Sequence, residues 1–129
     1  MVRRGDRFLL LHTVPDGHWN HAAGQVEPSE RASGAAQREL AEETGLTKPV
    51  TDLGMPQHYP VPEDRRDAYP AGLAQVRVDS FVAEAPAGWE PTLSEEHDER
   101  RWCTYGEALE LLTWPEARAA LAVAARTKI

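Results

Sequence analysis

Apolar and polar residues along the chain form two patterns that are typical of strands. Residues 8–12, FLLLH, are an almost unbroken apolar run behind a Gly5-Asp6 turn signal, which indicates a buried strand. Residues 74–84, AQVRVDSFVAE, alternate between apolar and polar side chains and predict the clearest strand of the chain. Further strands are predicted at 50–58, where a proline favours an edge or a bulge, and at 99–103.

A helical period follows in the next part of the chain. From 31 to 44, the apolar Ala35 and Leu40 fall on or near one face, and acidic side chains fall on another. Gly45 stands where a left-handed residue would end the helix. The pattern therefore predicts a helix over 31–44.

The C-terminal part of the chain predicts two short helices. Thr104 and Glu107 have the spacing of a capping box, in which each side chain hydrogen-bonds the backbone N–H of the other residue. Thr113 and Glu116 repeat that spacing, with a proline between them at a position that an early helical turn tolerates. We expect helices at 105–112 and 115–126. The expected core residues of this region are Trp102, Cys103, Leu111 and Trp114.

The segment 60–72 interrupts these elements with three prolines and five consecutive charged residues. It predicts a long exposed loop, and such loops in compact domains are usually functional or mobile. Strands on both sides of a central helix, with helices at the C-terminus, predict an α/β or α+β sandwich with a mixed sheet. With 129 residues, the chain is expected to form a single domain over 1–129.

Composition narrows the classes of partner. A formal charge of −7 and a pI near 5.2 disfavour binding to nucleic-acid polymers or to an anionic membrane surface. No apolar run approaches the roughly 18 residues of a membrane span. The N-terminus lacks the long apolar region of a signal peptide, and a single cysteine cannot form an internal disulfide. We therefore expect a cytoplasmic protein.

Three carboxylates crowd one face of the predicted central helix. Glu39 lies three residues before Glu42 and four before Glu43, so neighbouring side chains are close enough to touch. Like charges in these positions repel each other. Either they point into open solvent, which is the usual reason for a charged helix face, or a cation holds them together. Carboxylate oxygens suit hard cations, and magnesium above all.

The spacing around these glutamates resembles the Nudix box at every fixed position. The matching residues are Gly24, Glu30, Arg38-Glu39-Leu40, Glu42-Glu43 and Gly45-Leu46. A motif of this length is far more specific than a lone glycine pattern. The chain is therefore identified as a member of the Nudix family. Ala23 and Ser29 occupy variable positions where glycine is frequent, and both could stiffen the loop.

The resemblance implies the Nudix fold, in which a mixed sheet is sandwiched between helices. It also implies hydrolysis of a nucleoside diphosphate linked to another moiety, with Mg²⁺ or Mn²⁺ as the cofactor. The implied metal ligands are Glu39, Glu42, Glu43 and the backbone carbonyl of Ala23. Arg38 would orient the glutamates by ion pairing, and Glu30 would brace the loop.

Members of the Nudix family differ in their general base. Some use a glutamate of the box, for which Glu42 is the candidate here, and others use a glutamate in a later loop. In this chain Glu95, Glu96 and His97 precede the predicted strand 99–103, and Glu96 is favoured as the base or as a metal ligand. His97 could tune such a base, although a surface histidine is the simpler interpretation.

The segments around the box are similar to those of the dihydroneopterin triphosphate and dATP pyrophosphohydrolases. Trp19 and His21 precede the box and could stack on a base or pterin ring, or simply pack beneath a loop. Arg65 and Arg66 could contact the substrate phosphates from the 60–72 loop, with Tyr69 beside them, or form part of a solvated loop. These five residues are the candidate substrate contacts.

Several other functions stay open. The asymmetric diadenosine tetraphosphate hydrolases have a similar layout, and a house-cleaning hydrolase of oxidised nucleotides is a third candidate. The intact glutamates disfavour a catalytically silent binding module, and the place of Cys103, downstream of the box, disfavours a Nudix-fold isomerase. The hydrolases would bind a small nucleotide or pterin phosphate. A short first strand would leave an exposed sheet edge, which a second copy could cover to form a homodimer.

Overall fold

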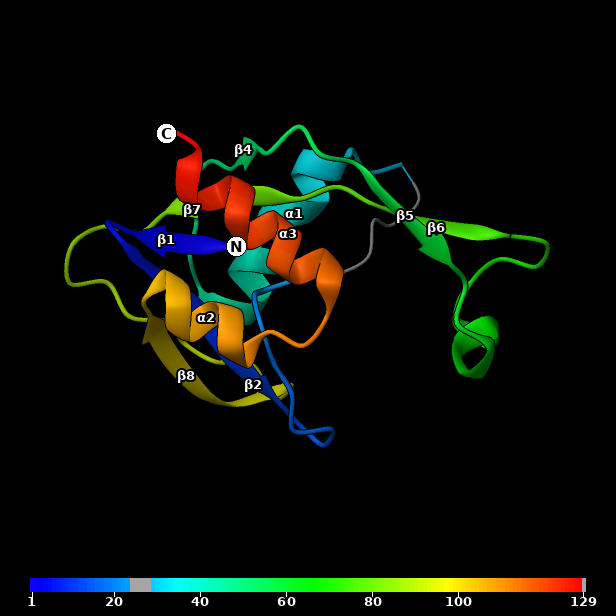
Figure 1. Cartoon of the computed structure of the whole chain (residues 1–129), viewed down its shortest axis with the longest axis horizontal. Coiled ribbons are helices and arrows are strands. Elements are labelled where there is room, and N and C mark those ends of the chain that lie inside the picture. Colours follow the sequence, from blue (N-terminus) through cyan, green and yellow to red (C-terminus); the bar gives the residue numbers. More distant parts are fainter. Residues whose placement is uncertain (24–28, 129) are drawn as a thin grey trace.

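The structure is a computed structural model that describes residues 1–23 and 29–128 (Figure 1). Within these residues a mixed sheet has the strand order β3-β2-β1-β7-β4. A further strand, β8, pairs with the edge of β2 that faces away from β1 and β3. The strands are β1 (Val2–Arg4), β2 (Arg7–Thr13), β3 (Trp19–Asn20), β4 (Thr51–Asp52), β7 (Phe81–Glu84) and β8 (His97–Cys103). β1 and β7 run parallel, and the other pairs are antiparallel. The predicted mixed sheet is confirmed.

A separate two-stranded ribbon is formed by β5 (Gln57–Pro60) and β6 (Gln75–Val78). The connection between them contains a 3₁₀ helix, η1 (Glu63–Ala68). In Figure 1 this ribbon extends away from the main sheet, at the right of the view. The predicted exposed loop over 60–72 is thus exposed over the described side chains of η1, and it contains this short 3₁₀ helix at its centre.

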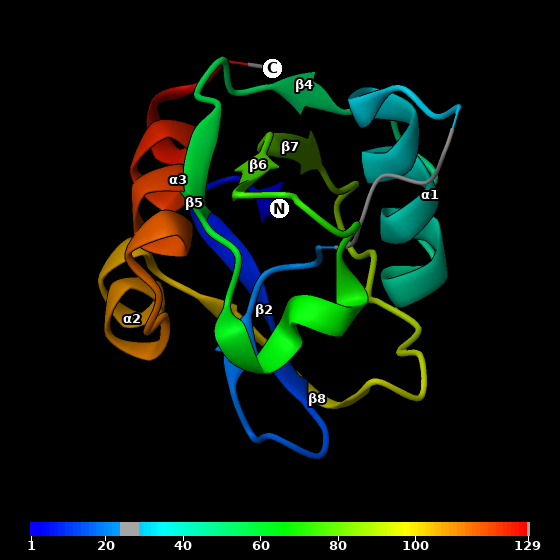
Figure 2. The same cartoon turned by 90° about the vertical axis from the view of Figure 1, so that its right-hand side faces the viewer.

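Helices cover both faces of the main sheet (Figure 2). The first helix, α1 (Ala32–Thr44), lies on one side, while α2 (Tyr105–Leu111) and α3 (Pro115–Arg126) lie on the other. These bounds agree with the predicted helices to within one residue. The arrangement is the predicted α+β sandwich.

The alternation of side chains along β2 explains this layering, because successive residues of a strand point to opposite faces. Leu9 and Leu11 belong to a buried cluster that contains Leu40 of α1. Phe8 and Leu10 belong to a second buried cluster, which includes residues of α2 and α3. β2 therefore contributes to both cores, which is why its sequence reads as an apolar run.

The prediction of one strand over 74–84 is wrong. The chain divides at Asp79 and Ser80, so that β6 joins the ribbon and β7 joins the main sheet. Ser80 is buried, and its carbonyl accepts a hydrogen bond of 2.9 Å from the N–H of Leu53. The three residues after it, 81–83, are all buried, as expected for a strand covered on both faces. The predicted strand 50–58 divides in the same way, into β4 and β5.

Local signals at two helix ends are confirmed, and a third is wrong. Gly45 ends α1 with a φ of 80°, and its N–H donates to the carbonyl of Ala41. Thr104 and Glu107 form the expected capping box at the start of α2. The predicted second box at Thr113 does not form. Instead α3 begins at Pro115, and Trp114 occupies its N-cap position. No side chain of the described residues makes a capping hydrogen bond at this end of α3.

Three further expectations concern burial and the sheet edge. Cys103 is fully buried, whereas Trp114, which was expected in the core, is 40% exposed. β1 pairs with β2 on one side and β7 on the other, so it leaves no free edge for a second copy. The edge argument for a homodimer is therefore wrong. Among the described residues, no helix combines the length and the apolar character needed to cross a membrane.

Candidate metal centre and active site

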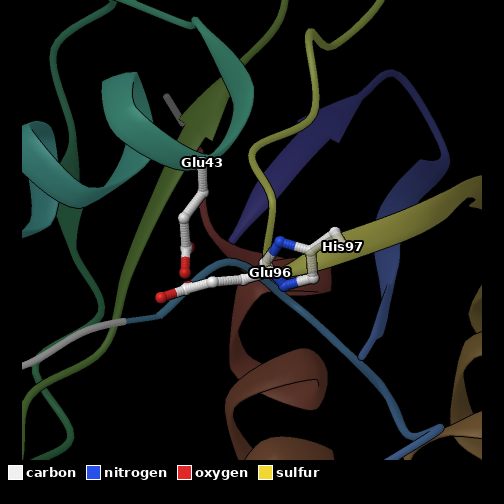
Figure 3. Close-up of side chains that lie close together, drawn as sticks. All are labelled: Glu43, Glu96 and His97. Atoms are coloured by element: carbon white, nitrogen blue, oxygen red, sulfur yellow. The ribbon is translucent and has the colours of Figure 1, made fainter. Parts of the chain in front are cut away.

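Glu43, Glu96 and His97 form a cluster between α1 and the start of β8 (Figure 3). Each offers one ligand atom, and these three atoms lie within 4.8 Å of one another. Glu43 comes from the last turn of α1, and the other two residues come from a part of the chain more than fifty residues away. The fold thus joins a residue of the predicted box to the later loop that the sequence analysis singled out.

Glu43 is the most enclosed acid of this cluster, with 5% of its surface exposed. Its Oε2 accepts a hydrogen bond of 3.0 Å from the N–H of Ala23. Burial raises the pKa of Glu43 to about 8, because a charged carboxylate loses hydration there. The Ala23 hydrogen bond opposes this shift, while the negative charges of Glu39 and Glu96 add to it. A cation bound here would stabilise the ionised form of Glu43 and so lower its pKa.

Backbone hydrogen bonds fix the position of Glu96 and His97. The carbonyl of Glu96 accepts a bond of 2.9 Å from the N–H of Val14, and the N–H of His97 donates to the carbonyl of Ser94 at 3.2 Å. His97 is also the first residue of β8 and pairs with Thr13 of β2, next to an irregularity in the register. The Glu96 side chain itself is exposed. Its carboxylate is thus open to solvent while it reaches toward Glu43 from a held backbone (Figure 3).

Arg38 contacts the other two acids of α1 and also Glu30, which precedes the helix. Its Nε and Nη2 donate to the two carboxylate oxygens of Glu30 at 2.8 and 3.0 Å, which is a bidentate contact. Its Nη1 donates to Glu39 at 2.8 Å and to Glu42 at 3.2 Å. The three acids therefore converge on one guanidinium, which offsets the repulsion between the charges on this helix.

The predicted metal ligands are brought together only in part. Among the described residues, the compact cluster contains Glu43 but neither Glu39 nor Glu42. Those two side chains contact Arg38 instead, on the same helix. Ala23 lies beside Glu43 through its N–H, whereas its carbonyl was the predicted ligand. Gly24 of the motif lies outside the described residues.

The predicted substrate contacts are found in two places. Trp19 on β3 is half-buried and its ring lies 5.1 Å from that of His12. His21 is half-buried too, with Nδ1 at 3.0 Å from the Ala22 carbonyl, and burial lowers its pKa to about 4. It is therefore neutral at physiological pH.

The other predicted contacts lie in or beside η1. Arg66 is exposed on this 3₁₀ helix, and Tyr69, which follows it, is half-buried. The side chain of Arg65 lies outside the described part of the structure. Binding of a substrate by these residues stays a prediction.

His97 is the residue that the sequence analysis undervalued. It was expected on the surface, but it is half-buried in the cluster, and burial lowers the pKa of its imidazole. β8 begins at His97, two residues before the predicted strand. This earlier start pairs His97 with Thr13 of β2, next to the irregularity in the register. The sequence signal was the histidine's place directly after Glu96.

Ser29 shows a second local feature of the box. Its φ is 72°, in the left-handed region that a side chain other than glycine rarely adopts. Glycine is frequent at this position in the motif, and the backbone keeps the conformation that glycine would favour. Here serine bears the strain, which for a single residue is about 1–2 kcal/mol.

The donor set fits a divalent cation. Two carboxylates and one imidazole are ligands that manganese and related ions accept. Two carboxylates that approach each other raise the pKa of one of them, and a bound cation would allow both to be ionised. The cluster could therefore bind a metal ion.

Comparison with known proteins agrees with this site. A family model for the NUDIX domain matches residues 1–123. The chain belongs to the Nudix family. Nudix hydrolases cleave pyrophosphate bonds, and membership of this family supports the same hydrolase activity for this chain.

Individual known proteins are similar to this sequence over most of its length. An octanoyltransferase from Myxococcus xanthus is 34% identical over 87% of this chain, but the chain spans only 30% of that protein. An asymmetrical bis(5'-nucleosyl)-tetraphosphatase from Caenorhabditis elegans is 30% identical over 84% of this chain and 75% of its own length. The structure of the Escherichia coli dihydroneopterin triphosphate pyrophosphohydrolase superposes with a TM-score of 0.80 at 23% identity, covering 93% and 87% of the two chains. That last match supports the fold alone.

Proposed function

We propose that this Nudix hydrolase uses Mg²⁺ or Mn²⁺ to cleave a phosphoanhydride bond of a nucleoside polyphosphate by attack of water. The observation that carries the proposal is the cluster of Glu43 and Glu96, in which a glutamate of the box meets a glutamate of a distant loop. Two carboxylates so placed, one of them buried, have no evident structural use without a cation. The proposed catalytic and metal-binding roles of both residues depend on their proximity in the fold.

The proposed ligands of the ion are Glu43 and Glu96, with Glu39, Glu42 and the carbonyl of Ala23 as the further candidates. A bound divalent ion would neutralise phosphate charge and so favour the transition state of phosphoryl transfer. Arg38 holds Glu39 and Glu42 on one side of α1. Its role is to position these acids, and its charge limits their repulsion.

Glu96 is also the proposed general base, with one carboxylate oxygen bound to the ion and the other left to accept a proton. Its exposed carboxylate is open to water, whereas Glu43 is enclosed and hydrogen-bonded to Ala23. In the proposed reaction Glu96 takes a proton from water as the water oxygen bonds to one phosphorus. The phosphoanhydride P–O bond breaks, and the other phosphate group leaves with the electron pair. Glu42, which is exposed beside Arg38, is the alternative base.

The first candidate substrate is a dinucleoside tetraphosphate that is cleaved asymmetrically. The support is the 30% identity to the Caenorhabditis elegans tetraphosphatase, which extends over 75% of that protein. The second candidate is a pterin or deoxynucleoside triphosphate, which is favoured by Trp19 before the box. In either case Trp19 and His21 would contact the ring, and Arg65, Arg66 and Tyr69 would contact the phosphates. A cytoplasmic location and a homodimer stay predictions.

A substrate panel tests the proposal. The protein is assayed with diadenosine tetraphosphate, dihydroneopterin triphosphate, dATP and an oxidised nucleotide, each with Mg²⁺ and with Mn²⁺. Chromatography of the products distinguishes the candidates, since asymmetric cleavage gives ATP and AMP while triphosphates give pyrophosphate and a monophosphate. Reaction in ¹⁸O-water identifies the phosphorus that is attacked. Full turnover in the presence of a chelator would refute the metal requirement.

A further inference from the structure

We propose that His97 is a direct nitrogen ligand of the divalent ion and forms, with Glu43 and Glu96, a site of two carboxylates and one imidazole. This inference rests on the metal dependence proposed above and assigns one more ligand to the same centre. It was not expected from the sequence, where His97 was interpreted as a surface residue.

Distances support one ion shared by all three side chains. Metal–nitrogen and metal–oxygen bonds of about 2.0–2.2 Å allow two ligands of one ion to be at most about 4.4 Å apart. The ligand atoms of Glu43, Glu96 and His97 already lie within 4.8 Å of one another. The bound of 4.8 Å exceeds this limit by only a few tenths of an ångström, and the exposed Glu96 side chain is free to adjust its carboxylate toward an ion. Figure 3 shows the imidazole beside the two acids.

His97 differs from His12 and His21 in the hydrogen bonding of its Nδ1 atom. The Nδ1 atom of His12 lies 2.7 Å from Asp98, and the Nδ1 atom of His21 lies 3.0 Å from the carbonyl of Ala22. The Nδ1 atom of His97 is buried and has no hydrogen-bond partner among residues 1–23 and 29–128. Buried polar atoms are rarely left without a partner. A cation in the cluster would engage the ring that the protein otherwise leaves incompletely satisfied.

The backbone holds His97 where a ligand is needed. Its N–H donates to the Ser94 carbonyl, and it pairs with Thr13 at the start of β8. The preceding residue, Glu96, is held through its carbonyl by Val14. Two adjacent residues with fixed backbones therefore face Glu43 from across the site. A preorganised pair of this kind loses little freedom when it binds an ion.

A nitrogen ligand changes which metal the site prefers. Carboxylate and water ligands suit magnesium and manganese, whereas imidazole suits transition metals such as zinc, iron and nickel. We therefore expect the site to favour transition-metal ions over Mg²⁺ more strongly than a site made only of carboxylates would, and Mn²⁺ is the spectroscopic probe of this difference. This expectation concerns binding and does not depend on which substrate the enzyme cleaves.

The test is electron paramagnetic resonance of Mn²⁺ bound to the full chain. Electron spin echo modulation of the wild-type complex should contain ¹⁴N coupling from a directly bound imidazole. His97→Ala should lose this coupling and bind Mn²⁺ at least about tenfold more weakly, since loss of even an outer partner of a metal ligand costs about 10–100-fold. His58→Ala, which removes an exposed histidine of β5, is the matched control and should keep the coupling.

A conservative variant separates ligation from structure. His97→Asp supplies an oxygen in place of the nitrogen, so it should bind Mn²⁺ without ¹⁴N coupling and discriminate less against Mg²⁺. Melting curves in chelator show whether the variants are folded. If wild-type protein binds Mn²⁺ without nitrogen coupling, or if His97→Ala keeps the coupling, the assignment of His97 is wrong and the metal centre stands. If wild-type protein binds no Mn²⁺ or Mg²⁺, the proposed function fails as well.

Discussion

Glu43 combines burial with a charge that the proposed chemistry requires. In the absence of a cation its pKa is about 8, so the folded protein holds a proton that the unfolded chain releases near pH 4.5. Between these two values the folded state binds more protons, and the contribution of Glu43 to stability falls as pH rises. His21 and the α-amino group of Met1 have lowered pKa values and contribute with the opposite sign. The contribution of Glu43 to the pH dependence of stability is therefore measured as the difference in stability between the wild-type protein and a Glu43 variant.

Glu43→Gln is expected to stabilise the metal-free protein at pH 8 while abolishing metal-dependent turnover. Glutamine can still accept the hydrogen bond from Ala23, but it does not bring a charge into the buried site. Thermal melting in chelator at pH 4.5 and pH 8 should show a gain in Tm over wild type only at the higher pH. The control is Glu42→Gln on the same helix, whose side chain is 57% exposed and which should change Tm little at either pH. An unchanged Tm of Glu43→Gln at pH 8 would contradict the raised pKa.

Glu96→Gln tests the proposed general base. Loss of a positioned base typically lowers the rate about 10²–10⁴-fold, and we expect a fall of that size in kcat with saturating metal. Glu95→Gln is the matched control, because it removes the neighbouring exposed acid and leaves the cluster intact. Equal losses in the two variants would argue for a general effect of loop charge and against a specific base.

At the scale of elements, the ends of helices and strands determine where the site residues point. α1 ends directly after Glu43, with Gly45 in the left-handed conformation. β8 begins at His97, held by Ser94 and Thr13. The site residues thus lie in the last turn of α1 and at the start of β8. Backbone hydrogen bonds fix both positions.

The capping box of α2 gives a test at this scale. The Thr104 side chain accepts from the Glu107 N–H at 3.2 Å, and the Glu107 carboxylate accepts from the Thr104 N–H at 2.9 Å. Thr104→Ala should lower the free energy of unfolding by about 1 kcal/mol, the usual cost of losing such a cap. Thr113→Ala should cost little, because Trp114 occupies the N-cap position of α3 and the described residues make no side-chain capping bond there that could be lost. Urea denaturation of both variants measures this, and equal losses would contradict the assigned caps.

At the scale of the whole molecule, the candidate metal centre joins two layers of the fold. Glu43 belongs to the helix on one face of the sheet, and Glu96 and His97 belong to a segment that leads into the sheet itself. An ion at this place would link parts of the chain that are far apart in sequence. Ligand binding to the folded state alone stabilises it by mass action.

Addition of metal should therefore raise the melting temperature of the whole domain. At a concentration 100 times the dissociation constant, the gain is about 2.7 kcal/mol. Chelator should reverse the shift, and Glu43→Gln should reduce it strongly. Binding should also release a proton near pH 7, because Glu43 must ionise to become a ligand. Calorimetry in buffers of different ionisation enthalpy measures that proton, and a shift in Tm without proton release would place the ion elsewhere.

Much of this protein is determined by short-range information in its sequence. The period of α1, its Gly45 end, the capping box at Thr104 and the spacing of the box residues all depend on groups within a few positions of each other. Such signals can be interpreted without knowledge of the fold. They suffice for the helices, the reaction class and the box glutamates as candidate ligands.

The tertiary structure decided what depends on distant partners. The segment 74–84 divides between two sheets because β6 pairs with β5 while β7 pairs with β1 and β4, and β1 lies inside the sheet because β7 pairs with it. In the same way, only the packing of α1 beside the start of β8 selects Glu43 from the three box glutamates as the partner of Glu96 and His97. The sequence supplied three similar carboxylates on one helix, and burial between two layers of the fold made one of them different.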